Sequence, residues 1–193
     1  LFPYTTLFRS FGLTFFETRN LKTDKILPVT KEEKADELEE KVNNVLSTLT
    51  IDEKIAQMLI IYDRTNQMTD SLKNELITYK PSGFILFTEN FSSYENTLNF
   101  INEIKSTSEI PMIISIDQEG GSVQRLKNLT DAAVSIIPSM QKVSEKNNVE
   151  FTKNIGKVIA EELQVFGINM NFAPDIDVLD NKYNKVIGTR SFG

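Results

Sequence analysis

The stretch Ile116–Leu126, with the sequence IDQEGGSVQRL, decides how the rest of the chain is interpreted. It follows an apolar run, Met112–Ile116, which is typical of a buried strand. Two carboxylates, Asp117 and Glu119, come at the exit of that strand, two glycines then allow a sharp turn, and Arg125 follows. Enzymes with α/β folds bind polar ligands at the C-terminal ends of their strands. The stretch therefore indicates a ligand-binding loop, although an ordinary charged loop after a strand has the same composition.

The composition of the 193 residues is that of a globular protein, with 40% hydrophobic and 25% charged residues. No apolar run approaches the roughly 18 residues that cross a bilayer, so we expect no membrane span. The net charge of −6 argues against nucleic acid as the main partner. The chain has neither Cys nor His, which excludes disulfides and thiolate zinc sites and removes the commonest general base. Hydrolysis within this chain would therefore depend on carboxylates.

The first 30 residues carry no pattern that continues into the rest of the chain. We interpret residues 1–30 as a leader, a linker or a non-native scar, with Leu1–Ser10 as the scar and Leu21–Thr30 as the linker. A shortened signal peptide is the alternative, because Phe11–Phe16 is apolar. We interpret residues 31–193 as one partial domain, since the sequence lacks a starting Met and ends without a closing element.

Helical and strand-like patterns alternate along residues 31–193. The pattern predicts a helix over Lys31–Leu49 and a short second helix that begins after the N-cap Thr50. It predicts further helices over Thr69–Thr78, Ser93–Lys105, Pro138–Lys146 and Asn148–Phe166. It predicts strands over Gln57–Tyr62, Phe84–Phe87, Met112–Ile116 and Ile168–Phe172. Helical crossovers of this length imply parallel pairing. Four such units fit half of an eight-stranded barrel or a small doubly wound sheet.

Five blocks of the sequence together resemble glycoside hydrolase family 3, in its bacterial β-N-acetylglucosaminidase (β-hexosaminidase) branch. The blocks are TIDEKIAQM at Thr50–Met58, GFILFTEN at Gly83–Asn90, the IDQEGGSVQRL stretch, NFAPDIDV at Asn171–Val178 and IGTRSFG at Ile187–Gly193. The resemblance implies an α/β fold, the N-terminal half of a (β/α)8 TIM barrel with about four βα units, truncated after its fourth strand. Residues 31–193 would then be a partial catalytic barrel domain of that family.

The resemblance also implies an activity. The family member would be an exo-acting retaining hydrolase that removes terminal β-N-acetylglucosamine from cell-wall fragments, as in peptidoglycan recycling, or from chitin-type oligosaccharides. The small carbohydrate would be its partner, no cofactor or metal is expected, and a bacterial cytoplasmic or secreted location is left open. The family's Asp nucleophile and His acid/base are expected beyond Gly193, so this chain should hold no catalytic residue and show no significant turnover. The alternatives are a β-glucosidase or phosphorylase of the same family, a non-catalytic sugar-binding barrel, and an α/β domain without a sugar role.

Three residues match substrate-binding positions of the family: Asp117, Arg125 and Arg190. A carboxylate accepts hydrogen bonds from neighbouring sugar hydroxyls, and a guanidinium donates to sugar oxygens through its planar fork. For Arg125, a structural ion pair with Asp117 or Glu119 is the alternative. We expect Glu119 to anchor its loop and Asp177 to orient Arg190 or the loop.

Further expectations concern other carboxylates and one serine. Asp117 and Glu119 could flank a sugar as an acid and nucleophile, since retaining enzymes hold two carboxyls about 5–5.5 Å apart, but the family does not use them so. Asp175 stands where the family more often has an apolar residue. A metal site from Asp175, Asp177 and Asp180 is conceivable, but the spacing matches no known loop and we expect none. Ser122 replaces a basic residue found in many members, which leaves the preference of the outer pocket open.

Overall fold

The computed structural model describes residues 31–181 and 183–193, so the expectations for residues 1–30 lie outside the described residues. Contacts divide the chain into two units, residues 1–45 and residues 46–193. The described part of the first unit belongs to α1 (Lys31–Thr48), which agrees with the predicted helix. The one-domain boundary at residue 31 stays a prediction. The second unit contains the sheet and the loops at its C-terminal edge.

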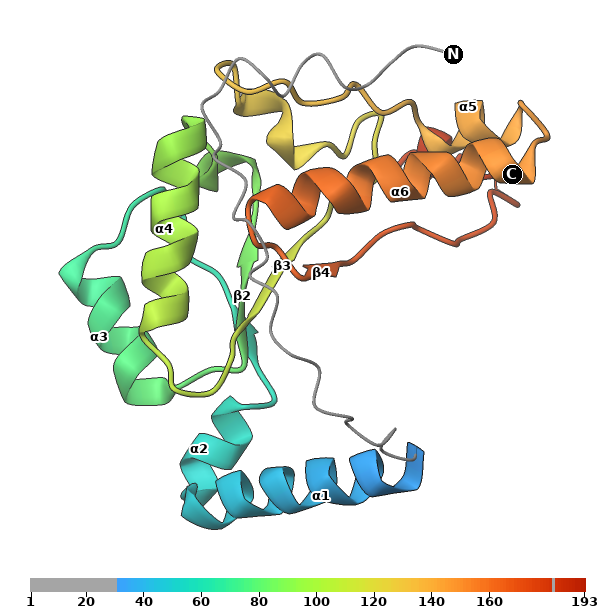
Figure 1. The fold of residues 1–193 in the computed structure, drawn as a ribbon. Helices are drawn as coiled ribbons and strands as arrows, with labels where there is room; N and C mark the ends of the chain where they lie inside the picture. The colour runs from blue at the N-terminus through green and yellow to red at the C-terminus, as the bar shows by residue number, and fades with distance from the viewer. Residues whose placement is uncertain (1–30, 182) are drawn as a thin grey trace, which may run out of the picture. The chain divides into compact units, whose positions relative to one another are not determined.

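Four parallel strands form the sheet of the second unit (Figure 1). The strands are β1 (Ile60–Ile61), β2 (Gly83–Leu86), β3 (Ile113–Ile116) and β4 (Met170–Asn171). They pair in the order β1-β2-β3-β4, and every neighbouring pair is parallel. A doubly wound sheet reverses its strand order at a switch point, whereas a barrel adds each strand beside the last. The order therefore agrees with the predicted barrel half and not with the doubly wound alternative.

At least one α-helix lies between each strand and the next, as the sequence pattern predicts, and two lie between β3 and β4. The α-helices of this unit are α2 (Ile51–Ala56), α3 (Asp70–Tyr79), α4 (Tyr94–Ser106), α5 (Met140–Ser144) and α6 (Val149–Val165). Single 3-10 turns lie at η2 (Thr88–Asn90), η3 (Arg125–Asn128) and η4 (Gly188–Arg190). Thr50, Thr69, Ser93 and Asn148 cap α2, α3, α4 and α6 through their side chains, and Thr50 with Glu53 completes the expected capping box.

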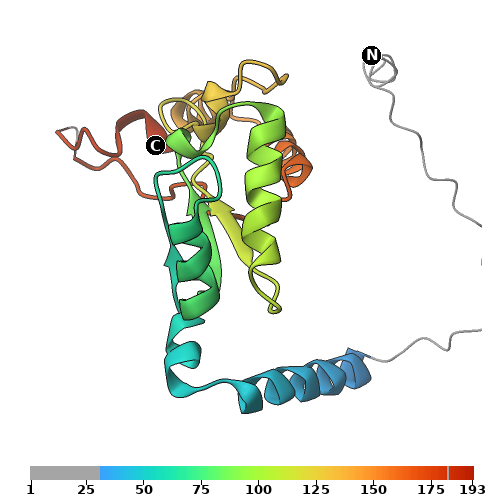
Figure 2. The ribbon, with the colours of Figure 1, turned by 90° about the vertical axis from the view of Figure 1, so that its left-hand side faces the viewer.

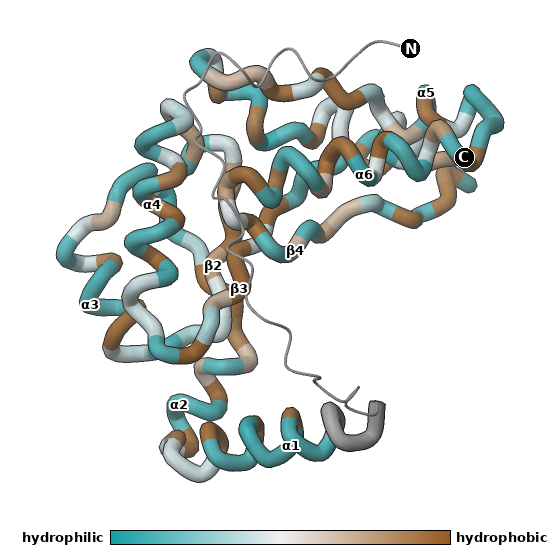
Figure 3. Tube along the Cα trace, in the orientation of Figure 1, coloured by the Kyte–Doolittle hydropathy of each residue, from teal (hydrophilic) through white to brown (hydrophobic). Residues whose placement is uncertain are grey.

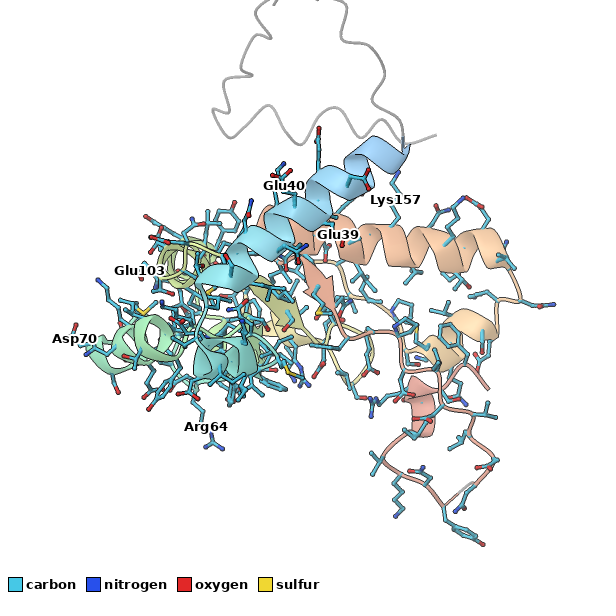
Figure 4. The ribbon with its side chains drawn as sticks, turned by 90° about the horizontal axis from the view of Figure 1, so that it is seen from below. Glu39, Glu40, Arg64, Asp70, Glu103 and Lys157 are labelled. Atoms are coloured by element: carbon cyan, nitrogen blue, oxygen red, sulfur yellow. The ribbon has the colours of Figure 1, made fainter. Side chains whose placement is uncertain are left out.

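Helices α3, α4 and α6 pack on one face of the sheet. The fully buried side chains Phe84, Leu86, Ile114 and Ile116 of β2 and β3 meet Leu72 and Leu76 of α3, Phe100 and Ile104 of α4, and Ile159 and Leu163 of α6. In Figure 2, α3 and α4 lie in front of the strands, and Figure 3 shows β3 as a hydrophobic run. Charged residues of the same helices, Asp70, Glu103 and Lys157, point outward, as does Arg64 (Figure 4). The core therefore fixes β2 and β3 firmly, and with them the loops that leave their C-terminal ends.

Three predicted elements are longer than the structure shows. The strand predicted over Gln57–Tyr62 is only Ile60–Ile61, because α2 ends at its cap Gln57 and backbone turns carry the chain through the next two residues. The strand predicted over Ile168–Phe172 is reduced to β4, and the helix predicted over Pro138–Lys146 to α5. Apolar runs do not reveal how many of their residues find a backbone partner. In the part of the chain that the structure describes, no helix is both long and apolar enough to cross a membrane.

Candidate functional site

The chain leaves all four strands at one edge of the sheet, and the side chains there form a row. Phe87 follows β2, Asp117 follows β3 and Phe172 follows β4. The register pairs Leu86 with Ile116 and Ile116 with Asn171. The residues that follow them, Phe87, Asp117 and Phe172, therefore lie side by side on adjacent strands. Phe172 is 48% exposed, and Asp117 is half-buried. Asp117 therefore lies at the C-terminal edge, on the strand between those that carry Phe87 and Phe172, where the sequence predicts a ligand.

The loop after β3 is held in one conformation by Gln118, whose side chain is buried. Its Oε1 accepts the N–H of Arg125 at 2.7 Å, and its backbone N–H and C=O pair with the side-chain amide of Asn171, both at 3.0 Å. Gly120 has a φ of 107°, which other residues rarely adopt, and a short bridge pairs it with Val123. The loop thus returns Arg125 to the strand end that carries Asp117.

Arg125 and Asp117 form an ion pair, with 3.1 Å between Nη2 and Oδ2. The guanidinium also lies over the Phe87 ring, with its carbon 5.0 Å from the ring centroid. Both partners are about one-quarter exposed, so a ligand has access to them. Among the described residues, the second carboxylate oxygen of Asp117 accepts no hydrogen bond. The pair leaves one acceptor of Asp117 for a ligand, and the substrate-binding role of Arg125 stays a prediction beside its structural alternative.

Arg190 joins the loop after β4 to the loop after β3. Its Nε and Nη2 donate to the two oxygens of Glu119 at 2.9 and 2.7 Å, and Nη2 also lies 2.9 Å from Asp175. The Glu119 side chain is only 4% exposed and that of Asp175 9%. Hydrogen bonding to Glu119 raises the pKa of Arg190 further above its usual value. Glu119 is thus committed to a bidentate pair, as its expected anchoring role requires.

Asp175 is the carboxylate of this loop that pairs with Arg190, and the expected role of Asp177, to orient Arg190 or the loop, stays a prediction. Asp175 Oδ1 accepts the N–H of Asp177 at 2.9 Å, which turns the chain and leaves the Asp177 side chain exposed. Asp177 supports the loop through its backbone instead, because its C=O accepts the Ser191 hydroxyl at 2.6 Å. The Asp-x-Asp spacing after a strand was the only sequence signal for this turn. Within the described residues, no three carboxylates gather as a metal site would require.

A second cluster, which sequence reasoning missed, lies beside Arg125 at the ends of β1 and β2. The rings of Tyr62 and Phe87 meet edge to face at 4.9 Å, and the Tyr62 hydroxyl donates to Glu89. Burial, followed by the Glu89 carboxylate, raises the pKa of Tyr62. The buried Asn90 accepts the N–H of Phe87 at 2.7 Å and donates to two carbonyls of the loop after β1 at 2.8 and 2.6 Å. The aromatic residues that end two predicted strands, Tyr62 and Phe87, were the available signal.

A cavity of about 300 Å³ lies on the other side of Glu119. Its walls come mainly from apolar residues of α6 and from Met140, Ala173, Pro174 and Phe192, while Gln118, Glu119 and Asn171 contribute a smaller polar part. A sugar needs several polar groups around its hydroxyls, so this cavity suits it poorly. The open edge with Asp117 and Arg125 is the better candidate site.

Known proteins match most of the length of this chain. A family model described as the glycosyl hydrolase family 3 N-terminal domain matches residues 50–193. A β-hexosaminidase from Idiomarina loihiensis is 37% identical over 142 residues, which are 72% of this chain and 41% of that protein. A β-hexosaminidase A from Pseudoalteromonas piscicida is 35% identical over 125 residues, 62% of this chain and 21% of that protein.

Solved structures of the same family are also similar. A family 3 β-N-acetylglucosaminidase from Paenibacillus sp. matches with a TM-score of 0.70 and 31% identity over 76% of this chain and 28% of its own. NagZ from Neisseria gonorrhoeae, solved with N-trifluoroacetyl-D-glucosamine, matches with a TM-score of 0.59 and 28% identity over 69% of this chain and 40% of its own. The chain therefore spans less than half the length of these relatives.

Proposed function

The chain belongs to glycosyl hydrolase family 3, and from that premise we propose that it supplies the sugar-binding part of an exo-acting retaining β-N-acetylhexosaminidase. Its substrate is a terminal β-linked N-acetylglucosamine, on a cell-wall fragment or a chitin-type oligosaccharide. The names of the similar proteins, β-hexosaminidases and β-N-acetylglucosaminidases, support this substrate class. A small carbohydrate is therefore the partner that the proposal assigns.

The observation that carries the proposal is the arrangement of two guanidinium–carboxylate pairs at one strand edge. Asp117 with Arg125 offers acceptors and donors side by side, which matches a sugar hydroxyl that both donates and accepts. Arg190 is held by Glu119 and Asp175 at the neighbouring strand end. Sites that pair substrate hydroxyls with buried or half-buried polar groups discriminate strongly against analogues that lack them. We assign substrate contact to Asp117, Arg125 and Arg190, and support to Glu119 and Asp175.

The proposal places neither the nucleophile nor the acid/base among these 193 residues. Glu119 is unsuited to act as a nucleophile beside Asp117, because both of its oxygens accept hydrogen bonds from Arg190. The chain has no His to act as acid/base. The 193 residues would then bind the sugar, and residues outside them would carry out bond cleavage.

The test is a hydrolysis assay on the full-length protein, expressed from the complete reading frame that contains this sequence. We expect release of 4-nitrophenol from its N-acetyl-β-D-glucosaminide, a rate on the glucoside lower by at least about 100-fold, and loss of activity in Asp117→Asn. The Asp177→Asn variant is the matched control and should retain activity. Equal rates on both substrates would replace the proposal with a β-glucosidase, and sugar binding without hydrolysis would replace it with a non-catalytic barrel. Robust turnover by the isolated 193-residue chain would contradict the placement of the catalytic groups.

A further inference from the structure

We propose that Phe87 and Tyr62 are positioning residues for Arg125, which they direct to Asp117 and away from Glu89. The identity of the ligand in this inference rests on the proposed function, whereas the positioning itself depends only on contacts within the chain. The residues involved follow three adjacent strands: Tyr62 follows β1, Phe87 follows β2 and Asp117 follows β3.

The Arg125 side chain has few direct restraints. Its Nη2 reaches Asp117 at 3.1 Å, while its buried Nε has no hydrogen-bond partner among the described residues. The backbone N–H of Arg125 is fixed by Gln118, but this does not set the position of the guanidinium. Besides the ion pair with Asp117, the guanidinium is positioned by the face of Phe87, whose ring centroid lies 5.0 Å from the guanidinium carbon. A cation over an aromatic face is attracted by the ring quadrupole, so the ring holds the guanidinium without occupying its donors.

Glu89 is a competing carboxylate for Arg125. Glu89 lies on the η2 turn, which contacts the η3 turn that begins at Arg125, because the Asn128 side chain donates to the Thr88 carbonyl at 3.1 Å. Hydrogen bonding from Tyr62 lowers the pKa of Glu89 most, and the charge of Arg125 also lowers it. The Tyr62 hydroxyl donates to one oxygen of Glu89. The Tyr62 ring also packs edge to face on the Phe87 ring, with 4.9 Å between the centroids. Tyr62 therefore contacts both Glu89, which competes for Arg125, and Phe87, which supports the guanidinium. Arg125 is thereby left to pair with Asp117, where the sugar hydroxyl would bind.

Steady-state kinetics of the full-length protein test this positioning. We expect Phe87→Leu to raise KM for the 4-nitrophenyl N-acetylglucosaminide about fivefold, as a partly exposed cation–π contact predicts, with kcat within about twofold. Phe87→Tyr keeps an aromatic face and should restore the wild-type KM. Tyr62→Phe removes the hydroxyl that donates to Glu89, so the ionised Glu89 should compete for Arg125 and raise KM. Adding Glu89→Gln to Tyr62→Phe removes the competing charge and should reverse that rise. Phe84→Leu is the matched control, because this buried ring on β2 meets Phe100 in the core and should lower Tm without changing KM.

A double-mutant cycle separates positioning from packing. In an Arg125→Ala background, Phe87→Leu should cause no further rise in KM. An equal rise in both backgrounds, or the same rise in Phe84→Leu, would overturn the inference.

A measurement without sugar keeps the inference independent of the proposed function. The Nε–H resonance of Arg125 in NMR spectra should carry a ring-current shift that disappears in Phe87→Leu and remains in Phe87→Tyr. If the protein hydrolyses no N-acetylglucosaminide but this shift behaves as expected, only the proposed function fails. An unchanged Arg125 resonance in Phe87→Leu would refute the positioning itself.

Discussion

Arg190 and Glu119, which lie 71 residues apart in the sequence, face each other through two hydrogen bonds of 2.7 and 2.9 Å. The pair connects the loop after β4 to the loop after β3 across the C-terminal edge of the sheet. Glu119 is almost completely buried, so its charge depends on Arg190 for compensation. The relative placement of the two candidate sugar-binding loops therefore depends on this pair.

We expect Glu119→Gln to lower the free energy of unfolding by about 2–3 kcal/mol, because it leaves a partly buried guanidinium with one charged partner fewer. The value is below that of a fully buried pair, since Arg190 is 25% exposed. Urea denaturation at neutral pH measures the change. Glu161→Gln is the matched control, because its pair with Lys157 at 3.7 Å is exposed and should contribute less than about 0.5 kcal/mol. Equal effects of both variants would contradict a structural role for Glu119.

The two aspartates after β4 should differ sharply. Asp175→Asn removes a carboxylate 2.9 Å from Arg190, so it should loosen the guanidinium and raise KM about tenfold, in the range of a charge-assisted hydrogen bond. Asp177→Asn changes an exposed side chain whose backbone makes the observed contact, so it should leave KM unchanged. Kinetics on the N-acetylglucosaminide distinguish the two. A larger effect at Asp177 would show that Asp177, and not Asp175, orients Arg190.

Two glycines offer a matched pair for stability. A Cβ on Gly120 would stand 2.6 Å from both the Ile137 side chain and the Pro138 carbonyl, at a φ of 107°. Gly120→Ala should therefore destabilise the protein by at least about 2 kcal/mol. Gly156→Ala lies within α6, where nothing stands within 4 Å of the new Cβ, and should stabilise the protein by roughly 0.5–1 kcal/mol. Thermal unfolding of both variants checks the signs, and a stabilised Gly120→Ala would contradict the described turn.

The capping box of α2 should make stability depend on pH in the acid range. Lys80, together with the backbone and hydroxyl of Thr50, lowers the pKa of Glu53 from 4.5 to about 2. Because the folded-state pKa is the lower one, this stabilisation is complete above pH 4.5 and is lost as the pH falls toward 2. The difference in unfolding free energy between wild type and Glu53→Gln should therefore shrink between pH 5 and 2.5, because this range spans the gap between the usual pKa of 4.5 and the folded-state pKa of about 2. A difference that stays constant over this range would show that Glu53 titrates normally.

The sequence by itself determined the alternation of helices and strands, the caps at Thr50, Thr69, Ser93 and Asn148, and the position of Asp117 at a strand exit. These features depend on residues close together in the chain, because hydrophobic periodicity and capping are local. Hydrophobic periodicity alone was compatible with both a barrel half and a doubly wound sheet. The resemblance of IDQEGGSVQRL and the other blocks to a known family favoured the barrel.

Tertiary structure decided which charged groups meet. The partners of Arg190 are Glu119 and Asp175, and the path of the chain after β4 sets that choice; one extra turn at Asp175 exposes Asp177. Tyr62, Phe87 and Arg125 come from three separate segments and meet only because β1, β2 and β3 end at the same edge. Ion pairs and ring contacts act over a few ångströms in space, so the partner of each group is set by how the strands pair and how the loops turn, which no local pattern specifies.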